Sequence, residues 1–117
     1  MIEERAKDLG RLIGQSQEYQ AVKRSNDTLH NDREAISILQ KMEQIRTDAQ
    51  RMIERGEEPS EEMEQQLNEL LGTVQRNPAY QQFVVAQENF DKTMLRVNQW
   101  ILEGIRKGAA SPIITLG

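Results

Sequence analysis

The stretch NPAYQQFVVAQENFDKTMLRVNQWILEGIRKG, residues 77–108, decides the fold class of this chain. It begins with a residue that can cap a helix, followed by proline, which suits the first helical position because no N–H is needed there. It ends with two basic residues and Gly108, which predicts the stop of the helix. Apolar residues recur between these ends at steps of three or four and therefore share one face: Phe83, Ala86, Phe90, Met94, Val97, Ile101 and Ile105. Such a helix spans about 45 Å, more than a small chain easily covers, so the stretch favours helix–helix assembly.

The composition of the 117-residue chain suits long helices with one buried face. Hydrophobic residues make up 37%, aromatic residues 4% and charged residues 29%, which is too polar a mixture for a thick globular core. The net charge of −4 comes without a clear basic stripe, which argues against direct nucleic-acid binding. The absence of cysteine excludes disulfides and thiolate metal sites within this chain and fits a cytoplasmic protein. No run approaches the roughly 20 apolar residues of a membrane span, so we expect no membrane partner.

Two predicted helices precede the clearest break in the chain. The first covers residues 2–13 and is ended by Gly14, and Ser16 can cap the second. The second runs from residue 17 to about residue 55, and Asp32 can mark a kink or a helix restart within it. Gaps in the apolar stripe before Asp32 weaken this half of the helix.

The break itself lies at residues 56–60, with Gly56 ending one helix and Ser60 capping the next. Glutamates crowd the first turn of the helix that follows, residues 61–76, where they complement the helix dipole. Because a helix start follows immediately at Asn77, this helix is predicted to be either nearly continuous with the long helix or sharply bent against it.

These elements predict an all-α fold of long antiparallel amphipathic helices, a helical bundle completed by oligomerisation. We expect one domain, residues 1–108, followed by an apolar C-terminal tail, residues 109–117. The long helix 77–108 is expected to pack in part on the apolar stripes 38–52 and 63–74 of the same chain. The rest of its length is then left for a second copy, in a homodimer or higher homo-oligomer.

The predicted oligomer contact lies toward the C-terminal end of the long helix. Its residues would pack as knobs into holes of a partner helix: Phe90, Met94, Val97, Trp100, Ile101 and Ile105. The apolar tail is predicted either to be a free or self-packed end or to dock a partner or a second copy. The docking residues would be Pro112, Ile113, Ile114 and Leu116.

A single constellation could hold a metal ion. His30, the only histidine, follows Asp27 by three residues and precedes Glu34 by four, and on one helix these side chains would lie near one face. A di-metal bundle site needs two such motifs and further carboxylates, and Val22 and Leu29 mark a different face as buried. We therefore prefer a solvated helix surface here, predict no cofactor and no catalytic residue, and keep a metal-dependent bundle enzyme as an alternative.

Short motifs recur in a fixed order along residues 1–107. They are Ala6-x-x-Leu9-Gly10-x-x-Ile13, Ser16-x-Glu18-Tyr19, Leu29-x-x-Asp32-x-Glu34-Ala35, Gly56 with Ser60-x-Glu62, and Asn77-Pro78. In this order and spacing they resemble the YlbF/YmcA family, which includes YheA-like proteins. The resemblance implies long antiparallel helices, assembly as a dimer or larger oligomer, and a bacterial cytosolic regulatory role without catalysis.

For some family members the resemblance also implies a role in competence, sporulation and biofilm formation, through a complex that influences ribonuclease Y. Iron–sulfur clusters that cysteines hold in some of those complexes are not carried over, because this chain has no cysteine. The predicted function is a self-associating, non-enzymatic regulatory adaptor with a protein partner. The alternative is a chaperone-like clamp that binds protein clients on adaptable surfaces formed by Met42, Met52, Met63 and Met94.

Overall fold

The computed structural model describes the backbone of residues 1–116 and the side chains of residues 1–109. Helices account for nearly all of this part of the chain, and no strand occurs in it. The helices are α1 (Ile2–Gly14), α2 (Gln17–Asn31), α3 (Arg33–Glu54), α4 (Glu61–Gln75) and α5 (Pro78–Leu116). The predicted all-α fold is confirmed.

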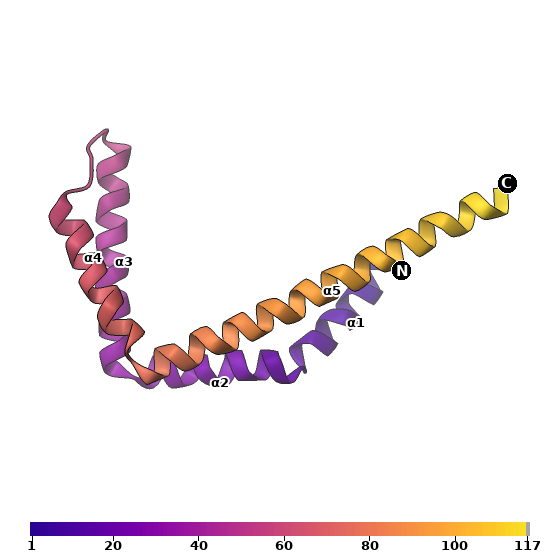
Figure 1. The fold of residues 1–117 in the computed structure, drawn as a ribbon, viewed down its shortest axis with the longest axis horizontal. Coiled ribbons are helices and arrows are strands. Elements are labelled where there is room, and N and C mark those ends of the chain that lie inside the picture. The colour runs from indigo at the N-terminus through magenta and orange to yellow at the C-terminus, as the bar shows by residue number, and fades with distance from the viewer. Residues whose placement is uncertain (117) are drawn as a thin grey trace.

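The helices form two arms that meet at a corner (Figure 1). One arm pairs α2 with the first half of α5, and the other is the antiparallel hairpin of α3 and α4. Helix α1 turns away from the axis of α2, and the end of α5 runs on past α2. The molecule is therefore elongated, with extents of 67 × 38 × 21 Å, and each arm is only two helices thick.

The predicted helix caps are confirmed at both serines. Ser16 Oγ accepts a hydrogen bond from the Tyr19 backbone N–H at 3.2 Å, and Ser60 Oγ accepts one from the Met63 N–H at the same distance. Gly56 has a φ of 79°, the left-handed conformation that glycine adopts without strain. Capping serines thus set where α2 and α4 begin, and a glycine sets where the chain turns after α3.

The single helix expected from residue 17 to about residue 55 is broken at Asp32, as the restart alternative anticipated. Asp32 is extended, with φ −90° and ψ 103°, and its Oδ1 accepts a hydrogen bond from the Ala35 N–H at 3.0 Å. The carboxylate thus satisfies an N–H in the first turn of α3 that no helical carbonyl can reach. As a result α3 leaves the corner in a new direction.

The partners predicted for the long helix, the stripes 38–52 and 63–74, are confirmed only at its first turns; its main partner was not predicted. Helix α5 lies along α2, whereas α3 and α4 pair mainly with each other. Contact between α5 and the stripes of the other arm occurs at its first turns, where Ala79, Tyr80 and Phe83 join the corner core. The apolar period specified which face of α5 is buried but carried no information on which helix covers it.

The predicted end of the long helix was wrong. Helix α5 does not stop at Gly108 but continues to Leu116. Gly108 does not adopt a positive φ, and the alanines that follow it favour helix propagation. The apolar tail predicted for residues 109–117 is thus a continuation of α5 as far as Leu116.

The core is concentrated at the corner. One cluster joins Leu29 of α2 to Ala35 of α3 and Ala79 of α5, and the second joins Ile38 and Met42 of α3 to Val74 of α4. Small alanines at the first cluster let three helix ends approach closely, because they bring little side-chain volume between the backbones. The corner is therefore the best-packed part of the molecule, and both arms become thinner away from it.

Candidate functional site

The angle between the two arms is fixed by two helix caps that bond to each other. Asp32 caps α3 through Oδ1, and Asn77 caps α5 by accepting a hydrogen bond from the Tyr80 N–H at 3.1 Å. Asn77 Nδ2 also donates to Asp32 Oδ2 at 3.3 Å, across 45 positions of the chain. The sequence predicted a helix restart at Asp32 and a cap at Asn77. It did not predict the contact between them, because residues 45 positions apart leave no local signal of their pairing.

The end of α5 holds the predicted oligomer contact, and the structure divides that set in two. Val97 is buried, with 6% exposed, and Met94 and Phe90 are half-buried. The Phe90 ring lies against the Tyr19 ring of α2, with centroids 5.4 Å apart. These three residues belong to the packing of the single chain.

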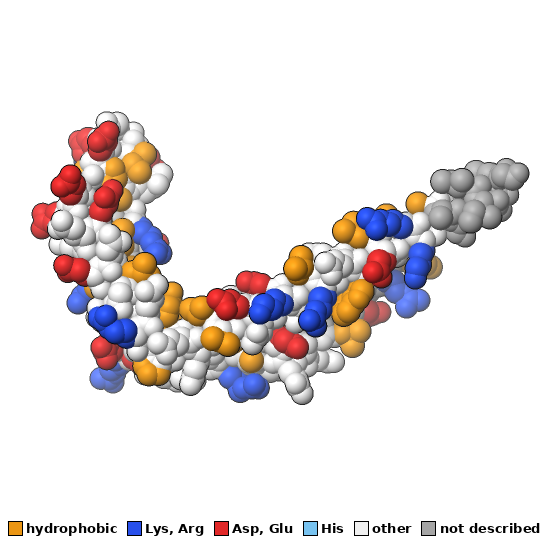
Figure 2. Space-filling model, in the orientation of Figure 1, with side chains coloured by type: hydrophobic (Ala, Val, Ile, Leu, Met, Phe, Trp, Pro, Cys, Tyr) orange, Lys and Arg blue, Asp and Glu red, His pale blue; other side chains and the backbone are white. Residues whose placement is uncertain are grey.

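The second half of the predicted set is open to solvent. Trp100 is 62% exposed, Ile105 59% and Ile101 45%. Leu95 and Leu102 are exposed as well, but at 3.6 residues per turn they lie about 140° and 160° around the helix from Trp100. We call the exposed end of the predicted set the distal face of α5: Trp100, Ile101 and Ile105. In Figure 2 apolar side chains lie among basic ones along this end of the helix.

The predicted docking residues of the tail lie at the extreme end of α5. Pro112, Ile113, Ile114 and Leu116 fall within the helical backbone, and their side chains lie outside the described residues. Their backbone continues α5 beyond the distal face.

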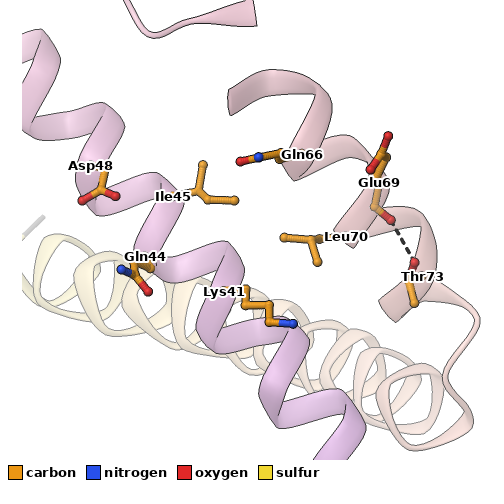
Figure 3. Close-up of a pocket in the computed structure, with 8 residues that line it drawn as sticks. All are labelled: Lys41, Gln44, Ile45, Asp48, Gln66, Glu69, Leu70 and Thr73. Atoms are coloured by element: carbon orange, nitrogen blue, oxygen red, sulfur yellow. Dashed lines mark hydrogen bonds between the residues drawn. The ribbon is translucent and has the colours of Figure 1, made fainter. Parts of the chain in front are cut away.

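A second exposed feature is a groove between α3 and α4 on the other arm (Figure 3). It has a volume of about 520 Å³. Ile45 of α3 and Leu70 of α4 point toward each other across it, and both are half-buried. We call this feature the α3–α4 groove; its lining residues are Lys41, Gln44, Ile45, Asp48, Gln66, Glu69, Leu70 and Thr73.

The candidate metal ligands do not share one helical face, which corrects the expectation from their spacing. Asp27 and His30 belong to α2 and Glu34 to α3, because the break at Asp32 separates them. His30 Nδ1 lies 2.8 Å from the Asn26 carbonyl oxygen, a local contact on its own helix. Among the residues that the structure describes, no three His, Asp or Glu side chains are grouped to hold a metal ion.

The methionines of the clamp alternative lie on packed faces. Met42 is buried at 4% exposed, and Met52, Met63 and Met94 are half-buried. They fill space between neighbouring helices, which is the ordinary use of a flexible thioether in a core. No open methionine-rich surface is formed by this set.

Comparison with known families gives a match over most of the chain. The family described as control of competence regulator ComK, YlbF/YmcA, matches residues 2–106. This range includes both caps of the corner, the α3–α4 groove and the distal face of α5. A search of the curated proteins gave no match. Within the described part of the chain, no helix has both the length and the apolar character that crossing a membrane requires.

Proposed function

Because the chain belongs to the YlbF/YmcA family, we propose that it is a bacterial regulatory adaptor that associates with itself through the distal face of α5. The family's description, control of competence regulator ComK, supports a regulatory role. The adaptor acts by binding other proteins rather than by catalysis. Its cellular context is the cytoplasm, in a complex that bears on competence, sporulation, biofilm formation or ribonuclease Y.

The exposure of Trp100, Ile101 and Ile105 is the observation that carries this proposal. Monomeric proteins rarely leave large apolar side chains clustered on one helix, and such clusters mark interaction sites. Full burial of an exposed isoleucine is worth about 1.5–3 kcal/mol, and Ile101 and Ile105, at 45% and 59% exposed, still have about half of that to gain. A helix from another molecule laid along this face would bury several of them together.

The position of the face explains why a second molecule is needed. Helix α5 has 39 residues, whereas its partner α2 has 15. Helix α1 lies beyond the N-terminal end of α2, but it contains no buried residue. The apolar stripe of α5 therefore continues beyond the part of the chain that covers it.

The test is the replacement of Ile101 by aspartate, with Val85→Asp as the matched control. Val85 is likewise an exposed residue of α5, at 56% against 45% for Ile101, but it lies outside the distal face. The mass from light scattering should fall for Ile101→Asp and stay at the wild-type value for Val85→Asp, with unchanged helicity in both. A wild-type protein that is monomeric at every concentration, or an Ile101→Asp variant that keeps the oligomer mass, refutes the proposal.

A further inference from the structure

The apolar seam of the α3–α4 arm is incomplete toward its tip. Near the corner the seam is buried, but beyond Met42 its side chains are only half-buried. Those on α3 are Ile45, Ala49 and Met52, and those on α4 are Met63, Leu67 and Leu70. A hairpin of two helices covers each stripe from one side only, so a third helix is required to complete this layer.

The α3–α4 groove is the place where a third helix fits. Ile45 and Leu70 form its apolar centre (Figure 3), and the charged side chains of its lining are Asp48, Glu69 and Lys41, two acidic and one basic. An amphipathic helix recognised by a groove lays its apolar side chains on such a centre and meets the edges with polar ones. The occupant should therefore present one apolar face flanked by charge.

The lining thus has a small net negative charge, and the arm beyond it is more strongly acidic. Residues 57–69 contain six glutamates and no basic residue. Acidic side chains accordingly crowd the tip of this arm in Figure 2. The ion pairs among the described residues are Lys7–Glu3 and Arg11–Asp8, both within α1. The carboxylates of the arm thus remain available, and a basic occupant is favoured.

The end of α5 has the matching properties. Residues 91–109 carry four basic residues and two acidic ones, and Arg96 and Lys107 lie on the same side of the helix as Trp100. The basic residues are exposed. The distal face of α5 therefore combines exposed apolar side chains with a net positive charge, the complement of the α3–α4 groove.

The lengths also agree. Along α3 the groove and the half-buried seam run from Lys41 to Met52, and Arg96 and Lys107 flank the distal face on α5; each stretch has 12 residues, about 18 Å of helix. Within one molecule the two surfaces cannot meet, because α5 runs away from the corner along the other arm (Figure 1). The distal face of α5 can therefore meet the α3–α4 groove only when the two belong to different molecules.

We propose that the distal face of α5 in one copy docks in the α3–α4 groove of a second copy. This inference rests on the proposed self-association and adds the surface on the partner that receives α5. When each copy gives its α5 to the other, both incomplete surfaces are covered and the contact closes as a two-fold dimer.

The charge pairing is tested by reversing it on each side. Asp48→Lys with Glu69→Lys alters the groove, and Arg96→Glu with Lys107→Glu alters α5. Each pair should raise the dissociation constant of the dimer by about tenfold or more, and mixing the two altered proteins should restore association. The matched control is Glu43→Lys with Glu54→Lys, which makes the same charge change on α3 outside the groove and should leave association unchanged.

Crosslinking identifies the receiving surface directly, since the wild-type chain has no cysteine. Gln66→Cys places a thiol in the groove and Ile101→Cys places one at the centre of the distal face. A mixture of the two proteins with a mild oxidant should give the mixed disulfide as the main dimer. A predominant Ile101→Cys homodimer, or groove reversal without effect on association, overturns this inference while self-association stands. Absence of association in the wild-type protein overturns both proposals.

Discussion

The bonded pair of caps at the corner should contribute more to stability than an isolated cap. Replacing Asp32 by alanine removes two hydrogen bonds, one to the Ala35 N–H at 3.0 Å and one from Asn77 Nδ2 at 3.3 Å. Ser60→Ala is the matched control, because Ser60 caps α4 through a single bond to Met63 and has no side-chain partner elsewhere among the described residues.

The expected magnitudes follow from these contacts. Loss of a helix N-cap costs about 1 kcal/mol, which is the whole effect expected for Ser60→Ala. Asn77 is buried, with 9% exposed, so Asp32→Ala also leaves its amide N–H group without a partner. An unsatisfied buried donor costs about 1–3 kcal/mol. The free energy of unfolding should therefore fall by about 2–4 kcal/mol for Asp32→Ala.

The assay is urea unfolding followed by far-ultraviolet circular dichroism, with all variants at one protein concentration because association contributes to stability. Asn77→Ala and the double variant Asp32→Ala/Asn77→Ala complete a double-mutant cycle. The two losses should overlap by about 1 kcal/mol, since each single change already breaks the shared bond. An Asp32→Ala loss no larger than that of Ser60→Ala, or strictly additive effects in the cycle, would show that the bond between the caps does not hold the corner.

Four further predictions rest on burial and backbone geometry. Val74→Ala should lower the free energy of unfolding by about 2 kcal/mol in urea unfolding, because Val74 is fully buried; Val85→Ala, at an exposed position, should leave it nearly unchanged. Gly56→Ala should cost about 1–2 kcal/mol in the same assay, because the φ of 79° is strained for alanine. Gly10→Ala should instead raise thermal stability, since a Cβ there meets nothing within 4 Å and alanine favours the helix. The fluorescence of Trp100, exposed in the single chain, should shift to shorter wavelength as protein concentration rises, whereas an unchanged spectrum would contradict burial of this residue on association.

The elements of this fold were largely predictable because their boundaries are local. Ser16, Ser60 and Asn77 each cap the backbone N–H three residues ahead, so the signal and its partner lie within one turn of the chain. Asp32 carried the same kind of signal, but the apolar residues on both sides of it also allowed one continuous helix. The structure resolves this ambiguity through a bond to Asn77, which no window of the sequence around Asp32 contains.

The pairing of helices was not predictable in the same way. The stripe of α5 suits any apolar groove, and its expected partners, the stripes 38–52 and 63–74, are as apolar as α2 or more so. The pairing is determined at the corner, where the small side chains of Ala35 and Ala79 let α3 and α5 approach α2 closely beside Leu29. Once the two caps bond there, α5 is directed along α2 and away from the hairpin.

The same geometry explains why core and interface residues could not be separated by periodicity. Val97 and Ile101 are four residues apart on one face of α5, yet one is 6% exposed and the other 45%. Their difference comes from where α2, the helix that covers this face of α5, ends. The position of that end depends on the fold of the whole chain. A stripe that extends beyond its internal partner therefore serves as core in its first part and is left exposed in its last. The length of α5 beyond α2, rather than any motif, is what leaves this apolar end uncovered.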